Sequence, residues 1–420
     1  MRKEDYFATF ILMVGLLAAT LSGFLRHTSL ADLLGTGQGA DIYLIAYSVP
    51  EFIIIALGII LPAAFIPLFV DYLKRFGEVA AWNFGVRVAG SLGFALLIVS
   101  FLAAIAAPYY LRLLAPGFSV IELSQTMRAA RIMMPAIVLM GSAIIIGAAL
   151  QAFRRFESIA LTNFVYNITF VIVVLGGSIT WLVGRTAMGV LLGSAAALIL
   201  QLPFLWKHRG SLRIWNAIKQ TSSRYSRSLS VRHFALLAGP LLIGYLIHHI
   251  IWFVDRAMAT TLGVGSVATL NYAYRLALVV GQLSGLAVST AIFPRLSEQA
   301  SAEDNSGLQS SLTDSLRFVW VIGLPATCAM IILRGPLIEV LYEHGAFSRE
   351  STIAVSGVLI WYAIAVLADA MCQPLWRIIY AWRSVVTVSV VNGIQTIVRI
   401  LFNIMLIQSF GIRGIAFSAV

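Results

Sequence analysis

The chain has 420 residues, of which 60% are hydrophobic and only 11% are charged, and its formal net charge is +11. Soluble domains carry roughly 25% charged residues, so this composition excludes a water-soluble globular protein. The two cysteines, Cys328 and Cys372, both lie in apolar stretches, which favours packing roles over a disulfide or a metal site.

Long apolar runs follow one another along the whole chain. Runs of about 20 residues are typical of membrane-spanning helices, whereas barrel strands would show about 10 residues of alternating polarity. We therefore predict an all-α polytopic membrane protein. The first run lacks a convincing cleavage site, so we expect it to be a retained helix rather than a signal peptide. The expected helices are 6–32, 38–72, 80–107, 121–153, 158–182, 187–206, 231–261, 264–298, 307–333, 350–380, 385–409 and a twelfth that begins near Gly411 and is truncated at Val420. Bends are expected at Pro50, Pro67, Pro135 and Pro374.

An internal repeat organises these helices. The segment 41–69 recurs 227 residues later, and further matches at offsets of 225 to 229 extend over six helices. Because six is even, both copies enter the membrane from the same side, which predicts two pseudo-symmetric six-helix lobes with a substrate site between them. We assign residues 1–206 to an N-terminal lobe, 207–230 to a basic cytoplasmic linker, and 231–420 to a C-terminal lobe that is incomplete at its end. The clearest matched pairs are Ala46 and Ala273, Tyr47 and Tyr274, Gly58 and Gly285, Pro67 and Pro294, Pro108 and Pro336, and Gly117 and Gly345.

The distribution of basic residues predicts a cytoplasmic N-terminus. From Lys207 to Arg232 the chain holds seven Lys or Arg residues and no Asp or Glu. Short loops rich in Lys and Arg stay on the cytoplasmic side of the membrane. The net positive charge therefore fits this topology and attraction to anionic membrane lipids, and we expect no nucleic-acid partner.

Ionisable residues within the apolar helices are the first candidates for function, since each costs about 2.5 kcal/mol or more in a membrane. Arg26 and Arg275 occupy related parts of the two copies, and their guanidinium groups suit a phosphate. Snorkelling to the interface is the alternative for Arg26, and a structural ion pair is the alternative for Arg275. Asp41 is either a partner or gate for Arg26 or an acid that favours the start of its helix. Glu51, which follows a proline, is expected to pair with a neighbour in its lobe.

A second candidate site involves Asp255 in the seventh expected helix. One interpretation is a local pair with Arg256, and the other is a carboxylate ligand of a sodium ion. Asn392 and Thr396, one turn apart on the eleventh expected helix, would add oxygen ligands to such a site.

Five segments resemble the MurJ/MviN lipid II flippases of the multidrug/oligosaccharidyl-lipid/polysaccharide exporter superfamily. They are GADIYLIAYSVPEF, LRLLAPGF, LNYAYRL, AIFPRLSEQ and LIEVLYEHGAFS. The resemblance covers nearly the whole chain. It implies a multi-pass protein of the bacterial inner membrane, typically with fourteen helices, that serves peptidoglycan biosynthesis, cell-wall biogenesis and cell shape. Such proteins move an undecaprenyl-pyrophosphate-linked precursor to the periplasmic leaflet by alternating access.

The resemblance also assigns residues to roles. Arg26, Asp41 and Arg275 match substrate-cavity positions, whereas two further cavity arginines of the family fall on Thr20 and Ile54. An acidic pair around the arginine of the eighth expected helix falls on Tyr274 and Leu278. Some members bind sodium through an aspartate that matches Asp255 and an asparagine that matches Asn392.

We therefore expect a non-enzymatic lipid II flippase. Arg26, Arg275 and Asp41 are its candidate substrate ligands, Glu51 and Tyr274 supply gating or cavity polarity, and sodium is its only candidate cofactor. One alternative is an exporter of another lipid-linked oligosaccharide, such as an exopolysaccharide or O-antigen precursor. Another is a transport-inactive scaffold that binds envelope-synthesis proteins. A membrane glycosyltransferase would need a catalytic acid in a water-facing loop, and the largest interior loop, 207–232, contains none.

Overall fold

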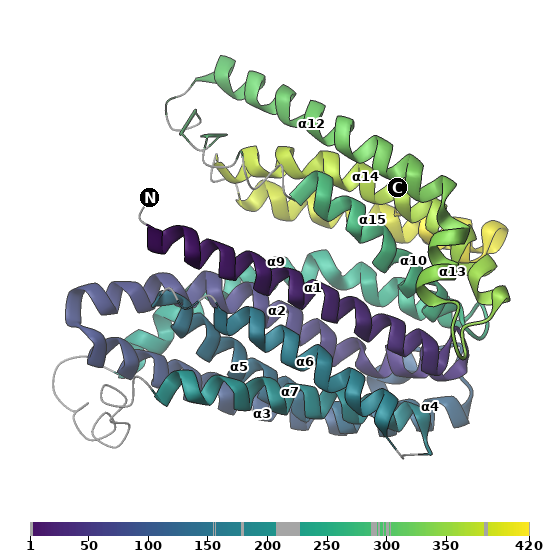
Figure 1. Cartoon of the computed structure of the whole chain (residues 1–420), viewed down its shortest axis with the longest axis horizontal. Helices are drawn as coiled ribbons and strands as arrows, with labels where there is room; N and C mark the ends of the chain where they lie inside the picture. Colours follow the sequence, from purple (N-terminus) through teal and green to yellow (C-terminus); the bar gives the residue numbers. More distant parts are fainter. Residues whose placement is uncertain are drawn as a thin grey trace. The chain divides into compact units, whose positions relative to one another are not determined.

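The computed structural model of the chain describes residues 3–153, 155, 157–177, 180–206, 227–286, 292, 295–296, 298–299, 302, 304–381 and 385–419. Most of the expected linker, residues 207–226, lies outside the described residues, as does Pro294. Regular secondary structure in the described part of the chain is helical, as the composition predicts (Figure 1).

The described helices are distributed along the whole chain. In chain order they are α1 (Lys3–Leu34), α2 (Gln38–Phe76), α3 (Glu78–Leu114), α4 (Val120–Met133), α5 (Pro135–Ala152), α6 (Glu157–Gly176), α7 (Leu182–Trp206), α9 (Arg227–Thr260), α10 (Ser266–Gly281), the π-helical turn η2 (Gln282–Leu286), α12 (Asn305–Ile332), α13 (Arg334–Tyr342), α14 (Arg349–Ala381), α15 (Val385–Phe410) and α16 (Ile412–Phe417).

Side-chain caps fix where two of these helices begin. Ser119 and Glu122 form a capping box at the start of α4, in which each side chain accepts a hydrogen bond from the other residue's backbone N–H. At α12 the Asp304 carboxylate accepts from the Gly307 N–H at 2.9 Å and from the Ser306 hydroxyl at 2.8 Å. These bonds, the backbone one first, hold the pKa of Asp304 below its ordinary value. Both helices therefore start where the sequence supplies an acceptor for their free N–H groups.

Three segments differ from the expected helices. The expected helix 121–153 is divided into α4 and α5, and the new helix begins at Pro135, because proline fits the first turn of a helix but not its interior. The expected helix 264–298 gives way to a π-helical turn after Gly281. The short helix α13, between the ninth and tenth expected helices, was not predicted.

Contacts within the chain divide it into two compact units. The first comprises Met1–Leu30, Ile42–Leu113 and Ser119–Tyr245, and the second comprises Ala31–Asp41, Leu114–Phe118 and Leu246–Val420. The second unit thus includes two short segments from the first half of the sequence. The assignment of residues 1–206 and 231–420 to two superposable lobes stays a prediction.

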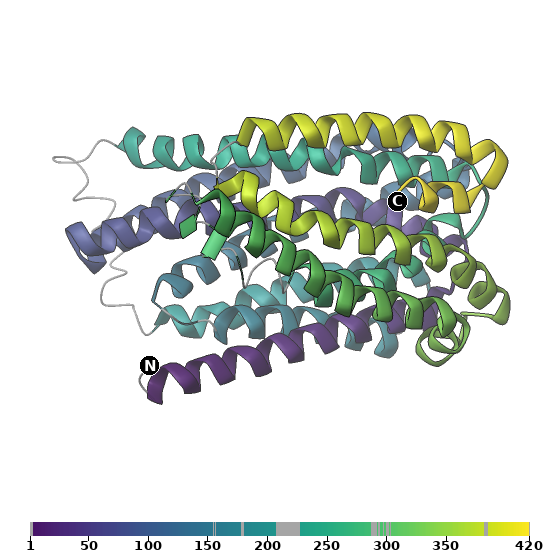
Figure 2. The same ribbon diagram turned by 90° about the horizontal axis from the view of Figure 1, so that it is seen from above.

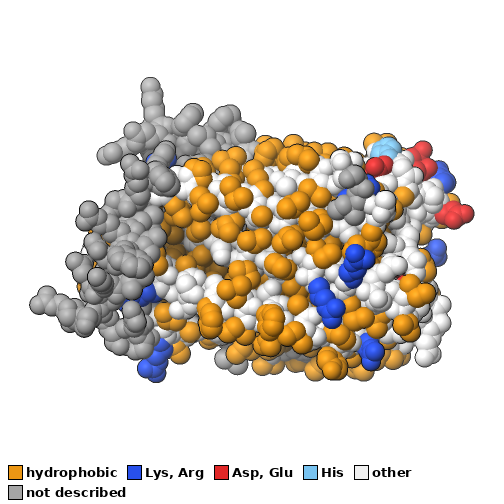
Figure 3. All heavy atoms as spheres, turned by 90° about the horizontal axis from the view of Figure 1, so that it is seen from below, with side chains coloured by type: hydrophobic (Ala, Val, Ile, Leu, Met, Phe, Trp, Pro, Cys, Tyr) orange, Lys and Arg blue, Asp and Glu red, His pale blue; other side chains and the backbone are white. Residues whose placement is uncertain are grey.

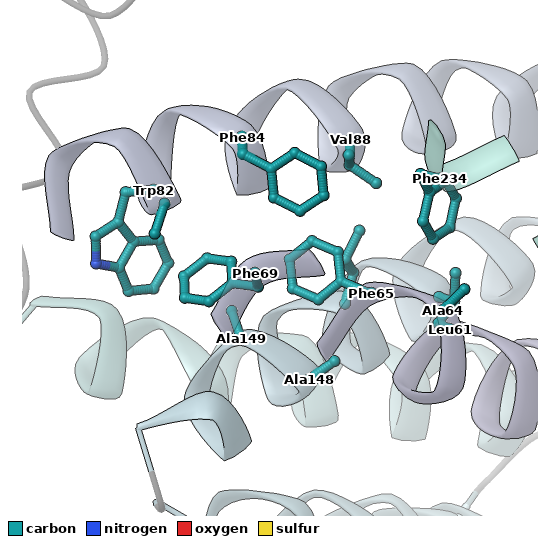
Figure 4. Packing of buried hydrophobic residues seen from close by; sticks show 12 residues of the cluster. Leu61, Ala64, Phe65, Phe69, Trp82, Phe84, Val88, Ala148, Ala149 and Phe234 are labelled. Atoms are coloured by element: carbon teal, nitrogen blue, oxygen red, sulfur yellow. The ribbon is translucent and has the colours of Figure 1, made fainter. Parts of the chain in front are cut away.

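An aromatic core holds α2, α3 and α5 together in the first unit (Figure 4). Phe65 stacks on Phe84 with ring centroids 5.5 Å apart, and Phe69 meets Trp82 edge-on at 5.6 Å. Ala148 and Ala149 of α5 complete the cluster with small side chains that let the helices approach. Between membrane helices such a core is stabilised by van der Waals packing of the rings rather than by their removal from water.

In the second unit α14 packs against α10, η2 and α12, and these helices run alongside one another (Figures 1 and 2). Two glycines permit this approach. A Cβ atom on Gly281 would lie 2.5 Å from Val366, and one on Gly285 would lie 2.7 Å from the backbone of Ala370. Tightly packed backbones at this point coincide with the π-helical turn, a feature that often marks functional sites.

Two loops related by the repeat make matching contacts inside the second unit. The Gly117 N–H donates to the Thr260 hydroxyl at 3.2 Å, and the Ala346 N–H donates to the Asp32 carbonyl at 2.8 Å. Gly117 and Gly345 are 228 residues apart in the sequence, and so are Asp32 and Thr260. Each half of the sequence therefore contributes a glycine loop that packs on a helix end from the other half.

Many helices expose large apolar side chains. Phe94 and Phe101 on α3 are 66% and 67% exposed, and hydrophobic side chains dominate the face drawn in Figure 3. Such a surface is suited to lipid rather than to water. Eight helical spans in the described part of the chain are long and apolar enough to cross a membrane, namely Gln38–Phe76, Glu78–Leu114, Val120–Ala152, Leu182–Leu205, Val231–Thr260, Ser306–Ile332, Arg349–Ile379 and Val390–Phe410.

Candidate functional site

Arg26 on α1 lies among aromatic rings of the first unit. Its guanidinium donates a hydrogen bond to the Tyr166 hydroxyl at 3.1 Å. The guanidinium carbon is 5.4 Å from the ring centre of Tyr166, 5.9 Å from that of Tyr47 and 5.6 Å from that of Phe170. Cation–π attraction at these distances holds the charge in place without neutralising it. We call this group of four residues the Arg26 site.

Two further polar contacts complete the Arg26 site. The hydroxyls of Tyr47 and Tyr166 lie 3.0 Å apart, so one donates to the other. Glu51, one helical turn beyond Tyr47, is only 5% exposed and interacts electrostatically with Arg26. A cation and two hydroxyls thus lie together, and an acidic residue is near enough to interact with the cation.

Asp41, expected among the substrate ligands, has a structural role instead. Its carboxylate accepts hydrogen bonds from the backbone N–H groups of Gly265 at 2.6 Å and Ala268 at 2.8 Å. The side chain is buried, and it caps the N-terminus of α10, where unpaired N–H groups and the helix dipole favour a negative charge. Asp41 also lies in the first turn of α2, where its charge favours the start of its own helix as expected, and it caps α10 in addition.

A cavity of about 410 Å³ lies inside the second unit. Its polar lining includes two arginines and two aspartates, so their formal charges cancel. These are Arg256, Arg399, Asp255 and Asp369, and Tyr274 adds a hydroxyl. The ring of Tyr274 meets that of Tyr362 edge-on at 5.4 Å, which fixes its direction at the wall. Tyr274 thus lies at the wall of this cavity, and its role in cavity polarity stays a prediction.

Asp255 forms an ion pair that the sequence analysis did not anticipate. One carboxylate oxygen accepts from the Arg399 guanidinium at 2.6 Å, and the other accepts from the side-chain amide of Asn403 at 2.7 Å. The expected partners Asn392 and Thr396 lie earlier on α15, where the Thr396 hydroxyl donates to the Asn392 backbone carbonyl at 2.8 Å. The asparagine that reaches Asp255 is therefore Asn403. The local alternative, Arg256, instead stacks on the Trp252 ring at 3.6 Å.

The residues around Asp255 do not fit a sodium site. Hard cations bind oxygen ligands, and a carboxylate supplies the charge that attracts them. Both oxygens of Asp255 already accept N–H donors, one of which carries a full positive charge. A free cation at this carboxylate would meet the repulsion of a guanidinium.

Arg275, the second expected anion ligand, lies on α10 and is half-buried. It interacts electrostatically with the hydroxyls of Tyr274 and Tyr342, both in the second unit. Tyr342 is buried against Tyr272 and Phe347, so its ring is held firmly. The anion-binding role of Arg275 stays a prediction.

Three residues of the cavity and its ion pair were missed from the sequence. Arg399 and Asn403 are polar residues four positions apart on the apolar helix α15, which places them on one face. Asp369 is a carboxylate within the apolar helix α14. The rule that an ionisable residue inside a membrane helix marks a functional candidate would have selected Arg399 and Asp369.

Solved structures of membrane transporters share the fold of this chain. A structure described as "Lipid II flippase MurJ, inward closed conformation" has a TM-score of 0.80, with 22% identity, and the match covers 98% of this chain and 84% of that one. An inward-facing multidrug resistance MATE family transporter of the MOP superfamily has a TM-score of 0.74, with 14% identity, over 98% of this chain and 93% of that one. The fold is therefore that of the MOP-superfamily transporters.

Sequence comparison narrows this class to one family. A relative from Rhizobium meliloti, named "Probable lipid II flippase MurJ", is 27% identical over 410 residues, which are 95% of this chain and 75% of the relative. The "Lipid II flippase MurJ" of Burkholderia cenocepacia is 24% identical over 411 residues, 96% of this chain and 78% of the relative. The family described as "Lipid II flippase MurJ" matches residues 30–420, and the chain belongs to it.

This membership confirms the resemblance seen in the sequence and the helical membrane fold. The chain is a multi-pass protein of the bacterial cytoplasmic membrane, and it is a transporter rather than an enzyme.

Proposed function

We propose that the chain is a flippase for lipid II, the undecaprenyl-pyrophosphate-linked precursor of peptidoglycan, and moves it from the cytoplasmic to the outer leaflet by alternating access. The observation that carries the proposal is the Arg26 guanidinium, which is held by three rings and one hydroxyl in the first unit. Family membership supports the substrate, because the relatives are named for lipid II. The basic segment 207–232 supports a cytoplasmic N-terminus.

The proposed recognition is electrostatic and directional. A guanidinium has five N–H donors in a planar fork, and Arg26 donates one of them to the Tyr166 hydroxyl. The fork matches the oxygens of a pyrophosphate. We propose that Arg275, in the second unit, is a further anion ligand. Glu51 then tunes the polarity around Arg26, and Tyr274 tunes that around Arg275.

A second candidate substrate is another lipid-linked oligosaccharide. The resemblance places Thr20 and Ile54 at two cavity positions that it implies to be arginine in the family, so this chain would offer fewer cationic contacts there. A glycolipid whose headgroup needs fewer anion contacts would be bound by the remaining pair. An exopolysaccharide or O-antigen precursor belongs to this class.

Complementation tests the proposal. A bacterial strain depleted of its own lipid II flippase should grow when it expresses the parent chain. A charged hydrogen bond contributes about 1.5–3 kcal/mol, so Arg26→Ala and Arg275→Ala should each weaken transport by about tenfold or more. Arg26→Lys and Arg275→Lys keep the charge but lose the fork, so they should rescue in part. Arg75→Ala is the matched control, since Arg75 is an exposed arginine paired with Asp71 at 2.6 Å.

Membrane abundance must be equal for all variants. Failure of a well-expressed parent to restore growth, combined with restoration of a strain that lacks another oligosaccharide flippase, would favour the second substrate. Full activity of both alanine variants would refute recognition by the two arginines and would favour the scaffold role.

A further inference from the structure

The ion pair between Asp255 and Arg399 crosses between two helices of the second unit. Asp255 lies near the end of α9, and Arg399 lies in the middle of α15. The N–O distance is 2.6 Å, with the two side chains 12% and 27% exposed. Neither charge is therefore fully hydrated. A carboxylate in such a position needs a compensating cation, because a buried charge without a partner is strongly unfavourable.

A chain of hydrogen bonds fixes the second oxygen of Asp255. The Asn403 amide nitrogen donates to it at 2.7 Å, and the Asn403 amide oxygen lies 2.5 Å from the Ser418 hydroxyl just after α16. Asn403 is completely buried. Its amide orientation is thereby determined, with the nitrogen towards the carboxylate and the oxygen towards the hydroxyl. The network connects α9, α15 and the residue that follows α16.

A carboxylate, an amide and a hydroxyl, all of which carry oxygen atoms that can ligate a small cation, are linked by hydrogen bonds beside a polar cavity. The place beside the carboxylate that a bound metal ion would occupy, however, is taken by the guanidinium of Arg399, which belongs to the protein.

We propose that Arg399 is a built-in cation that replaces a free metal ion at Asp255, so that the second unit needs no sodium for charge compensation. The tethered guanidinium is present at every step of a transport cycle and at every sodium concentration. Sodium therefore cannot act as a coupling ion through this carboxylate. The inference concerns cation binding within one unit and does not depend on which lipid is transported.

The proposal predicts that removal of the guanidinium will create a sodium site. In Arg399→Asn the shortened side chain would leave Asp255 uncompensated and would add an amide oxygen beside it. The variant should bind sodium, whereas the parent should not. Arg399→Lys, which retains a tethered positive charge, should behave like the parent. Asp255→Asn/Arg399→Asn, which removes both charges, should lose the new affinity.

The test uses the full chain in lipid nanodiscs. Thermal unfolding is measured in sodium, potassium and choline chloride at equal ionic strength, and binding of radioactive sodium is measured in parallel. The parent and Arg399→Lys should unfold at the same temperature in all three salts. Arg399→Asn should unfold roughly 1–2 °C higher when sodium is present at tenfold its Kd. Its double variant with Asp255→Asn should show no such shift.

Two results would overturn the proposal. One is a saturable sodium stabilisation of the parent that Asp255→Asn abolishes. The other is a folded Arg399→Asn variant that binds no sodium, which would mean that the guanidinium does not fill a cation position. If Arg399→Asn folds in none of the salts, Arg399→Lys decides, and a sodium response in that variant refutes the replacement. Because the readouts are folding and sodium binding, a chain that fails to move lipid II leaves them unaffected.

Discussion

Asp41 and Gly265 are joined by a hydrogen bond of 2.6 Å from the Gly265 backbone N–H to a carboxylate oxygen of Asp41. The second oxygen accepts from the Ala268 N–H at 2.8 Å, so one side chain satisfies two of the free donors at the start of α10. Gly265 has a φ of +85°, and a Cβ atom there would lie 2.1 Å from the Thr36 carbonyl oxygen. A glycine and an aspartate far apart in the sequence thus specify one helix start together.

Loss of the Asp41 carboxylate should destabilise the protein. Asp41→Ala leaves two buried N–H groups without this acceptor, which costs about 1–3 kcal/mol for each unsatisfied group. Asp41→Asn keeps one acceptor oxygen but turns an amide N–H₂ towards a donor, so its loss should be intermediate. Thermal unfolding of the purified protein measures the effect. Asp71→Ala, in an exposed pair with Arg75, serves as the control and should unfold like the parent. An unchanged transition in Asp41→Ala would refute the capping role.

The sequence predicted the helices well because long apolar runs leave the backbone few alternatives in a membrane. The break at Pro135 was also predictable, since proline removes a donor and clashes with the preceding turn. The end of α10 at Gly281 was not, because it depends on close contact with α14, a neighbour that the sequence does not identify.

The candidate sites were predictable to a smaller extent. The importance of Arg26 follows from a charge inside an apolar helix, but its aromatic neighbours come from α2 and α6. For Asp255 the partner depends on the lengthwise position of α15 against α9, which selects Asn403 rather than Asn392, eleven residues earlier. A pattern within one helix carries no information on that position.

Tyr166 should position Arg26 for anion binding. Tyr166→Phe keeps the ring but removes the hydroxyl that accepts from Arg26 and contacts the Tyr47 hydroxyl. A hydrogen bond contributes about 0.5–1.5 kcal/mol, so transport at low substrate concentration should fall by roughly 2- to 12-fold. Transport into vesicles at several lipid concentrations measures this and should show a raised KM with little change in thermal stability.

Tyr110→Phe is the matched control for this prediction. The Tyr110 hydroxyl is buried and has no hydrogen-bond partner among the described residues, so its removal should leave the KM unchanged. A Tyr166→Phe variant with the KM of the parent, tested beside an inactive Arg26→Ala, would show that Arg26 needs no help from this hydroxyl.

Gly345 should tolerate no side chain. Its φ is +54°, and a Cβ atom would lie 2.3 Å from a carboxylate oxygen of Asp32 and 2.5 Å from the Asp32 carbonyl oxygen. Backbone strain at such a position costs about 1–3 kcal/mol before the steric clash is counted, so Gly345→Ala should lower the unfolding temperature clearly. Gly335→Ala on α13 meets no atom within 4 Å and should be neutral or slightly stabilising. Equal unfolding temperatures for the two variants would contradict the close packing of this loop.

The acid stability of the loop after α13 should depend on Thr352. The Thr352 hydroxyl donates to the Glu343 carboxylate at 2.5 Å, and Arg349 donates at 3.3 Å; these contacts hold the pKa of Glu343 below its ordinary value of 4.5. A carboxyl whose folded-state pKa is depressed contributes stability above its unfolded-state pKa and loses that contribution as the pH falls through the folded-state pKa. The unfolding temperature of the parent should therefore decline below pH 4.5. Thr352→Val removes the largest cause of the depressed pKa and should flatten this decline, whereas Thr352→Ser keeps the hydroxyl and should follow the parent. Glu343→Gln, which cannot titrate, should show the flattest profile of all, and a Thr352→Val profile identical to that of the parent would rule out this hydroxyl as the cause.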